Sequence, residues 1–490
     1  MGFDVLGIAS QALAAQQLAL EVTGNNMANA TTPGYAVESV DLTENAPAPS
    51  ADMPSTIIGD GVTATAVTQA TNAFLSTSVN NQTSAVAYAT ALQQGISQVQ
   101  NIFEEPQSGG LAEMMNQFSQ SWLALSESPT SLSAAESVVQ DGQTLASTLN
   151  NMSSSLSSEE SSVNQNITSQ VQQINQYSAQ IAQLNQQIAT VSTSGQQPLA
   201  LIDQRNQLLT QLSKLTNISY TSGPADSVDV YIGAHPLVTG KQTYQININT
   251  VGVPNSAGTD TFTADQPVWA DSGAPVQVHS GSLAGNLALL YQQTISGSTG
   301  GPISAGYLTG YGQSLDTLAA QIANTVNNLQ ESGYAQSGST ATGIPFFTDG
   351  QSGTTTNITA GTITVNPNLT PDLVAQSSSA NSPGNGSNAE TMYNNLTNEV
   401  MTIGSSTTTL SGYYQSLVGQ VGLDGQNANN LATDSQNTLT SLNNDLQSAT
   451  GVDLNQQSIN MIQEEQSYEA AAKLVTTQQS VVQSLLSAVS

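Results

Sequence analysis

Charged side chains are scarce in this sequence. Asp, Glu, Lys and Arg make up 8% of its 490 residues, whereas soluble domains usually carry about 25%. The basic residues are Arg205, Lys214, Lys241 and Lys473, and 34 acidic residues bring the formal net charge to −30. A protein that binds nucleic acid neutralises phosphates with a basic surface. The composition therefore excludes a nucleic-acid partner and argues against binding to an anionic membrane.

The shortage affects charges of both signs, and two explanations fit it. In the first, the folded protein faces acidic liquid, where carboxyl groups with a pKa near ~4 lose their charge and cannot balance Lys and Arg. A surface rich in basic residues would then repel itself. In the second, the composition has drifted in an extracellular protein. The first explanation predicts a fold that tolerates acid.

Cysteine is absent, which excludes disulfide bonds and thiol chemistry. The first twenty residues lack both a basic segment and a long uninterrupted apolar core, so we expect no cleavable signal peptide. No stretch approaches the ~20 consecutive apolar residues that a membrane-spanning helix needs. If the protein leaves the cell, we expect it to use another export route.

Groups that could carry out catalysis are also few. His235 and His279 each lack a second histidine at metal-ligand spacing, which argues against a metal site or a catalytic base. The acidic pairs Glu159–Glu160 and Glu464–Glu465 are adjacent on predicted helices, so their side chains diverge, and we interpret them as solvated helix faces. Phosphate-binding glycine loops and nucleophile elbows are missing. The sequence predicts no catalytic residue, metal or cofactor.

Both ends of the chain show helical repeats of seven residues. In the N-terminal repeat the apolar positions are Leu6, Leu13, Leu20 and Met27. In the C-terminal repeat they are Leu454, Met461, Tyr468, Val475, Val482 and Val489, together with Leu486. Such spacing is typical of coiled coils, so we expect the two ends to pack together. The pairing could close one molecule or join many molecules into a polymer, and periodicity fits both.

The interior predicts a mainly α fold with inserted β structure. Apolar residues at helical spacing from Leu145 to Val191, followed by a returning helix from Leu201 to Leu215, predict a long coiled-coil hairpin. Short β-branched runs follow, separated by Gly, Pro, Asn and Asp. We expect three domains: a terminal helical coiled coil (1–34 and 451–490), a helical rod with β-hairpin elements (35–215 and 303–450), and an outer β-rich insertion (216–302).

The N-terminal segment carries a recognisable motif. Its residues include Asn25, Asn26, Asn29, Pro33, Gly34 and Tyr35. The motif resembles the N-terminal signature of flagellar rod, hook and junction proteins, and the segment from Gly451 to Leu486 is similar to their C-terminal helix. The resemblance implies that both ends belong to one flagellar axial protein.

Two interior segments resemble one family within this group of flagellar proteins. Asp203, Gln204 and Arg205 lie in a helix similar to the L-x-D-Q-R-D-x-L-L segment of the first hook-associated proteins, and Asn388 and Ala389 end a turn similar to their G-D-N-x-N-A segment. Where that family carries charge, this chain often has amides or small residues. Salt bridges between subunits are therefore in doubt, while the packing positions are kept.

The resemblance implies a structural subunit at the junction of hook and filament, which polymerises through its terminal helices into a ring. It implies the hook protein and a second junction protein as neighbours, and an export chaperone on the C-terminal helix. It also places the protein outside the cell, exported through the flagellar secretion channel without signal cleavage. The alternatives are a hook or rod subunit, a secreted coiled-coil adhesin, and a wall-degrading enzyme, for which we find no convergent acidic pair.

Overall fold

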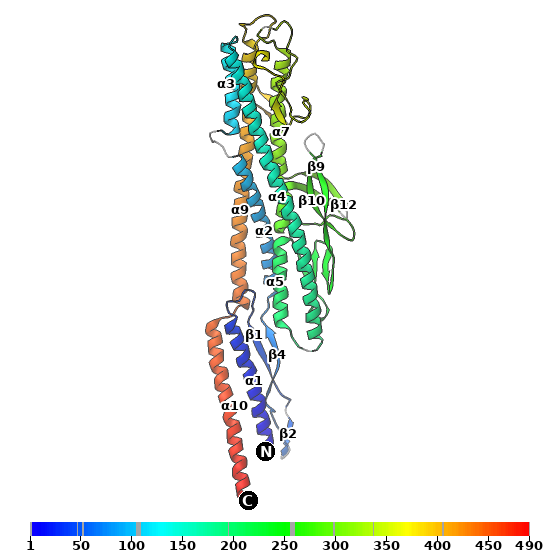
Figure 1. The fold of residues 1–490 in the computed structure, drawn as a ribbon. Helices are drawn as coiled ribbons and strands as arrows, with labels where there is room; N and C mark the ends of the chain where they lie inside the picture. The colour runs from blue at the N-terminus through cyan, green and yellow to red at the C-terminus, as the bar shows by residue number, and fades with distance from the viewer. Residues whose placement is uncertain are drawn as a thin grey trace. The chain divides into compact units, whose positions relative to one another are not determined.

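A computed structural model describes residues 2–46, 48–50, 53–103, 109–194, 196–254, 260–296, 299–336, 338–403 and 406–489. The chain is mostly helical with some strands (Figure 1), as the sequence predicts. It divides into two compact units, and we describe each by itself. Unit 1 comprises Met1–Ser84, Asn175–Tyr244 and Gln436–Ser490, and unit 2 comprises Ala85–Ile174 and Gln245–Ser435.

Unit 1 contains both ends of the chain. Its terminal helices are α1 (Gly2–Ala28) and α10 (Leu454–Val489), and α5 (Leu199–Leu215) follows α4 (Leu132–Ser192), whose last turns belong to this unit. Strands β1 (Glu38–Glu44) and β4 (Val62–Gln69) form an antiparallel pair, as do β2 (Ala48–Ser50) and β3 (Met53–Ile58). A four-stranded antiparallel sheet has the order β5 (Ser219–Ser222), β6 (Val228–Ile232), β7 (His235–Thr239), β8 (Gln242–Thr243).

Strand β6 shows why this sheet forms. Val228, Val230 and Ile232 are buried and alternate with the half-buried Asp229 and Tyr231. Alternate side chains of a strand point to opposite faces, so one face of the sheet is apolar and packs inward. The alternation in the sequence predicts this strand, and the structure places it there.

Unit 2 is built around helices α2 (Ala73–Ile102), α3 (Leu111–Glu127), α4, α6 (Gly281–Leu290), α7 (Tyr307–Ser332), α8 (Ser387–Thr397) and α9 (Leu410–Thr450). Its antiparallel strand pairs are β9 (Ile246–Pro254) with β10 (Asp260–Trp269), β11 (Tyr291–Ser296) with β12 (Thr299–Ala305), β13 (Phe347–Asp349) with β14 (Ile363–Val365), and β15 (Met401–Ile403) with β16 (Ser406–Thr408). Helices α2, α4 and α9 each continue into unit 1.

The core of unit 2 contains an aromatic cluster. Phe118 and Trp122 of α3 meet Phe346 and Phe347, with ring centroids between 4.8 and 6.2 Å apart. All four side chains are almost completely buried. Aromatic contacts of this kind stabilise a core by about 0.5–1.5 kcal/mol each beyond the burial of area, so they fix α3 against the start of β13.

The segment 216–302, which the sequence predicts as one insertion, is divided between the units. Strands β5 to β8 belong to unit 1, and the chain from Gln245, including β9 to β12, belongs to unit 2. The domain boundaries drawn from the sequence stay a prediction.

The interpretation of Glu160 as a solvated residue is wrong. Glu160 on α4 is half-buried, and burial raises its pKa to about 7, with a further contribution from the negative charge of Asp316. The pKa of Asp316 on α7 is also raised by burial, although its Oδ1 accepts a hydrogen bond of 2.9 Å from the Ala360 N–H. Glu160 is half-buried because it lies on the face of α4 that carries the buried Leu156, four residues before it, and the buried Val163, three residues after it.

A raised pKa in the folded state predicts that Glu160 destabilises the protein as pH rises. The folded state binds the Glu160 proton more tightly than the unfolded state, so its contribution to stability is full below the ordinary pKa of 4.5 and is lost as pH rises through about 7. Replacing Glu160 with Gln should therefore raise the free energy of unfolding of unit 2 by about 2–3 kcal/mol near pH 8. Near pH 4 the variant and the parent chain should be alike.

Hydrogen exchange of α4 and α7 at the two pH values measures this difference, because exchange reports the stability of a local region. Glu136→Gln is the matched control, since Glu136 is exposed on the same helix. Equal stabilisation by both variants, or stabilisation of Glu160→Gln in acid only, would contradict the prediction.

Candidate interface on the terminal helices

Helices α1 and α10 pack against each other within one molecule (Figure 1). The buried face of α1 consists of small and polar residues: Ala9, Ala15, Ala19, Val22, Thr23 and Asn26. Opposite them, Gln457 and Ala471 are the buried residues of α10. Two hydrogen bonds join the helices, from Thr23 to Glu464 and from Asn26 to Gln457, and α1 also packs on β1 and β4.

The described side chains of the predicted seam are half-buried or exposed in the monomer. On α1, Leu13, Leu20 and Met27 are half-buried, and Leu6 is 40% exposed. On α10, Met461 and Val475 are half-buried, whereas Leu454, Tyr468, Val482 and Leu486 are exposed. The side chain of Val489 lies outside the described side chains. The two helices are thus brought together, and much of their apolar surface stays outside the contact.

Other faces of α10 carry apolar residues that the sequence analysis did not single out. Ile459, Ile462, Leu474, Val481 and Leu485 are between 44% and 61% exposed. These residues fall outside the seven-residue series from Leu454 to Val489, because they occupy other positions of the repeat. Isolated exposed apolar residues are normal, but a row of them along one helix is typical of an interaction surface.

One carboxylate is enclosed in the contact between the terminal helices. Oε1 of Glu464 accepts a hydrogen bond of 3.1 Å from the Thr23 hydroxyl. Its Oε2 atom is buried and has no hydrogen-bond partner among the described residues. Burial raises the pKa of Glu464, and the Thr23 hydrogen bond lowers it in part. The predicted solvated face is therefore wrong for this residue too.

Asn26 is the centre of the N-terminal signature and is 1% exposed. Its Nδ2 donates to the Glu38 carbonyl at 2.8 Å, and its Oδ1 accepts from the Glu38 N–H at 2.9 Å and from the Tyr35 hydroxyl at 2.8 Å. Nδ2 also lies 3.3 Å from Oε1 of Gln457 on α10. One side chain therefore joins α1, the first residue of β1 and α10.

The remaining signature residues shape the turn after α1. Nδ2 of Asn29 donates to the Asn25 side chain at 2.9 Å, and Nδ2 of Asn25 lies 3.2 Å from the Tyr35 hydroxyl. Gly34 has φ +82°, a left-handed conformation that glycine adopts without strain. Pro33 precedes it, and prolines end helices. These residues turn the chain so that β1 runs back along α1.

Asp203 joins this cluster from α5. Its Oδ1 accepts a hydrogen bond of 2.8 Å from Nε2 of Gln69, at the end of β4. Burial raises the pKa of Asp203, in spite of the Gln69 bond, and the charge of Glu38 adds to the effect. Burial, with the charges of Glu38 and Asp203, also raises the pKa of Tyr35 to about 12. Tyr35 therefore keeps its proton and remains a hydrogen-bond donor to Asn26.

Arg205 has a different role from its neighbours. It is 5% exposed, and its Nη1 lies 3.4 Å from Oδ1 of Asn185 on α4 and donates to the Asp226 carbonyl. Asn185 in turn donates to the carbonyls of Val228 and Gly240, both at 2.8 Å. This network holds the β5–β8 sheet against α4 and α5. Gln204, by contrast, is exposed.

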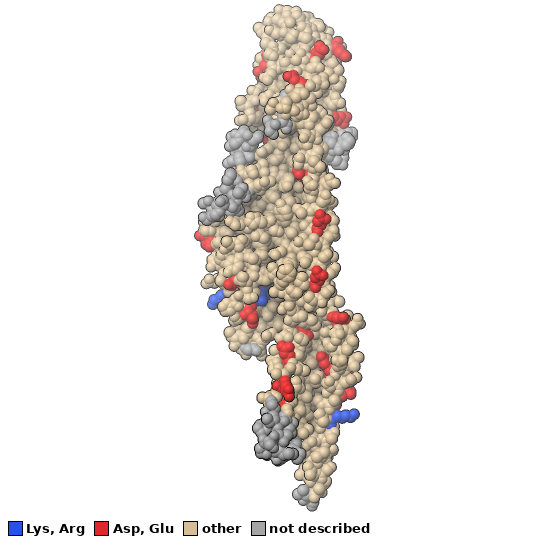
Figure 2. Space-filling model, turned by 180° about the vertical axis from the view of Figure 1, so that it is seen from behind, with Lys and Arg blue, Asp and Glu red and all other residues tan. Residues whose placement is uncertain are grey.

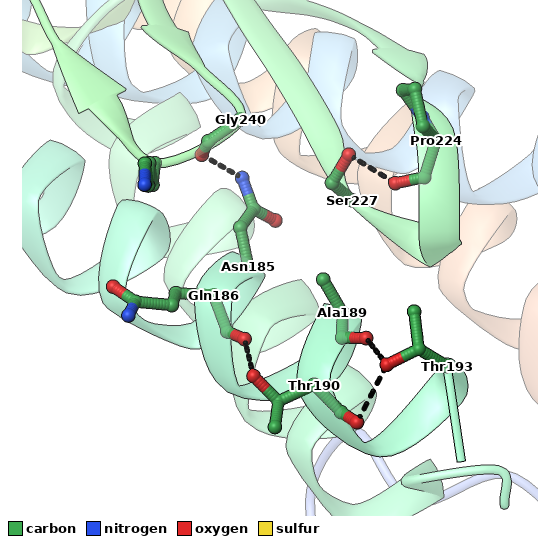
Figure 3. A pocket seen from close by; sticks show the side chains of 9 residues that line it. Asn185, Gln186, Ala189, Thr190, Thr193, Pro224, Ser227 and Gly240 are labelled. Atoms are coloured by element: carbon green, nitrogen blue, oxygen red, sulfur yellow. Dashed lines mark hydrogen bonds between the residues drawn. The ribbon is translucent and has the colours of Figure 1, made fainter.

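A cavity of about 480 Å³ lies beside Asn185 (Figure 3). In Figure 3 the hydroxyls of Thr190 and Thr193 point to backbone carbonyls of α4, and the Ser227 hydroxyl points to the Pro224 carbonyl. Lys241 is the titratable residue among those that line it. Hydroxyls engaged in this way and one ammonium do not form a catalytic arrangement.

The third signature segment lies in unit 2. Nδ2 of Asn388 donates to the carbonyls of Leu329 and Ala375 at 3.1 and 2.7 Å. Ala389 is fully buried, and its N–H donates to the Gln376 carbonyl at 3.2 Å. Asn388 thus adds a second hydrogen bond to the Leu329 carbonyl in the last turn of α7, which also accepts one from the Gly333 N–H. The signature residues stabilise the fold at separate places and do not form one site.

Three further observations concern other kinds of function. Among the described residues no group of three or more His, Cys, Asp or Glu could hold a metal ion. Neither Glu160 nor Asp316 lines the cavity beside Asn185. Residues Val5–Ala28 are long and apolar enough to cross a membrane by length and composition alone, which is weak evidence, and in the structure this helix packs against α10.

Comparisons with known proteins agree with the pairing of the chain ends. The helical domain of the flagellar hook-associated protein FlgK matches residues 96–347, and the flagella basal body rod protein family matches residues 6–35. The chain is 28% identical over 521 residues to flagellar hook-associated protein 1 of Bacillus subtilis (strain 168), covering 99% of this chain and 98% of that protein. The flagellar hook junction protein FlgK from Burkholderia pseudomallei has a similar fold, with a TM-score of 0.60, 16% identity, and coverage of 76% of this chain and 100% of that one.

Paired terminal helices, the asparagine-rich turn and the rod-protein match define a flagellar axial structural protein. Within that class, the chain belongs to the family of the flagellar hook-associated protein FlgK. Proteins of this family are structural parts of the external flagellum and assemble with its hook and filament components. The alternatives of a hook subunit, a rod subunit or an adhesin are thereby set aside.

Proposed function

We propose that this protein forms the junction between hook and filament by polymerising through its terminal helices. The exposed apolar residues of α10 carry the proposal. Within one molecule α1 packs against α10, and the apolar side chains on the other faces of α10 are exposed in the part of the chain that the structure describes. Burying them against neighbouring copies would release about 25 cal/mol for each Å² of apolar surface. Assembly would therefore bury the apolar surface that a single chain leaves exposed.

In the assembled junction, copies of the chain form a ring through α1 and α10. The predicted seam residues Leu6, Leu13 and Leu20 of α1 contribute to the subunit contacts, together with Tyr468, Val482 and Leu486 of α10. Hook protein lies on one side of the ring and a second junction protein on the other. The α4–α5 segment forms a coiled-coil hairpin arm, and the β-rich insertion faces outward.

Before assembly, an export chaperone covers α10, because an amphipathic helix fits a hydrophobic groove. The chain passes through the flagellar secretion channel unfolded and without cleavage of a signal peptide. The observation that supports this step is again the exposed apolar surface of α10, which needs cover in the cytoplasm.

Deletion of the gene tests the junction role. Cells without this protein should build hooks, fail to attach filaments and release filament subunits into the medium. Electron microscopy of the hooks, with immunoblots of the medium for filament protein, measures both effects. Normal filaments on the deletion strain would rule the proposal out, and cells without hooks would point to a role at an earlier stage of assembly.

A further inference from the structure

The turn before α8 contains a bond that is chemically reactive in proteins. Asn385 is followed by Gly386, and this is the single Asn-Gly sequence of the chain. Glycine has no side chain to hinder attack by its own backbone nitrogen on the preceding asparagine side chain. Whether such a pair reacts in a folded protein depends on how the turn holds the two groups.

The turn positions the asparagine amide for reaction. Its Oδ1 accepts a hydrogen bond of 2.8 Å from the Ser387 N–H. Attack at Cγ would place negative charge on this oxygen, and a backbone N–H that already points to it stabilises that charge. Among the described residues, neither the Gly386 N–H nor the Asn385 Nδ2 has a hydrogen-bond partner. No hydrogen bond within the described part of the chain therefore has to break before the nitrogen attacks or the ammonia leaves.

We infer that Asn385 is a site of spontaneous deamidation, in which the folded turn converts asparagine mainly to aspartate. The Gly386 nitrogen loses its proton to solvent base and bonds to Cγ of Asn385. The Cγ–Nδ2 bond then breaks, and ammonia leaves with a proton. Water opens the resulting five-membered imide at Cγ to give aspartate, or at the backbone carbonyl to give isoaspartate.

Packing around Gly386 favours the aspartate product. A Cβ atom at Gly386 would lie 2.1 Å from the Ser126 carbonyl oxygen, at the end of α3, so this part of the backbone has no room to move. Helix α8 begins at the next residue and packs on α3. Isoaspartate adds a methylene to the main chain and would push α8 away from α3, whereas aspartate leaves the backbone as it is.

The aspartate product also suits its position. A carboxylate at residue 385 would keep the Ser387 N–H as a donor, and a charge-assisted hydrogen bond is about twice as strong as a neutral one. Negative charge near the first turn of a helix is favourable. Conversion therefore tightens the start of α8, which carries Asn388 and its bonds to α7 and to Ala375.

Mass spectrometry of the purified full-length chain tests the inference. After incubation at mildly alkaline pH and proteolysis, the peptide with Asn385 should gain about 1 Da, and fragmentation should show mainly aspartate. Asn381, in the same turn and followed by Ser382, is the internal control and should react at least tenfold more slowly. The same chain in urea should give mainly isoaspartate.

Two variants isolate the contribution of the Ser387 N–H. Ser387→Pro removes this donor at a helix position that accepts proline, and it should slow the reaction several-fold. Ser387→Ala keeps the N–H and should react like the parent chain. If Ser387→Pro does not fold, the folded and urea-treated parent chains still decide: an unchanged Asn385 in the folded chain, or isoaspartate as its main product, overturns the inference.

Discussion

Chains carrying glutamate at both Ile462 and Leu474 should fold as monomers and fail to assemble. Both side chains are more than half exposed in the monomer, so the substitutions should change its free energy of unfolding by about 0.5 kcal/mol or less. In a subunit contact, however, each substitution would bury an unpaired carboxylate at a cost of several kcal/mol. We expect loss of assembly by at least a hundredfold, measured as motility and filament attachment in a deletion strain that expresses the variant.

The matched control is a chain with glutamate at Gln463 and Gln466. These amides are exposed on the same helix, and the substitutions change the net charge by the same amount without altering an apolar residue. Sedimentation and thermal melting should show that both variants remain folded monomers. Wild-type motility of the Ile462 and Leu474 variant, or equal loss in the control, would show that this surface is not the assembly contact.

The Asn26→Ala variant should lose much of the stability of the terminal helix pair. The substitution leaves the N–H and carbonyl of Glu38 and the Tyr35 hydroxyl without their partner, and an unpaired buried polar group costs about 1–3 kcal/mol. We expect α1 and β1 to lose about 3 kcal/mol, which is about a hundredfold in the rate of amide hydrogen exchange.

Asn25→Ala provides the comparison for this variant. Asn25 is exposed, and its side-chain bonds to Tyr35 and Glu38 measure 3.2 and 3.4 Å. Its loss should change exchange less than tenfold. Local exchange is the better measurement, because two compact units need not unfold in one transition. A similar increase in the exchange rate of α1 and β1 in both variants would show that Asn26 does not stabilise the helix pair more than Asn25 does.

The sequence predicts that the chain ends pair, yet the residues that the two helices bury within one molecule are not those of the predicted seam. Repeats of leucine and valine reveal that each end is a helix with an apolar surface. They do not show which part of that surface is buried within one molecule, and here the buried residues of α1 include Ala15 and Ala19. Alanine is small and common in helices, so its presence alone does not mark an interface.

The burial of Glu160 could have been predicted from the sequence. Residues 156, 160, 163 and 167 share one face of α4, and the three apolar members are buried. An acidic residue inside such a row indicates a buried carboxylate. The division of the β-rich segment near Tyr244 has no comparable signal, because it depends on contacts between residues distant in sequence.

The low charge of the chain can be seen on the surface of the structure. Figure 2 shows acidic side chains isolated from one another on a largely uncharged face, with few basic ones. Burial raises the pKa of Glu160, Asp316 and Glu464, so these groups favour acid over alkali. The explanation by an acidic exterior stays a prediction, and these three residues are among those at which acid would stabilise the fold.

The bonds between α1 and α10 also set the timing of folding. Thr23 and Glu464 are 441 residues apart, and Asn26 and Gln457 are 431 apart. Contacts between such distant residues form slowly, and these cannot form until synthesis has nearly finished. Helix α1 therefore cannot pair until α10 has been made, while the residues of unit 2 need neither end of the chain to begin folding. A chain that stopped before α10 would leave α1 without its partner, so the pair of terminal helices forms only in the complete molecule.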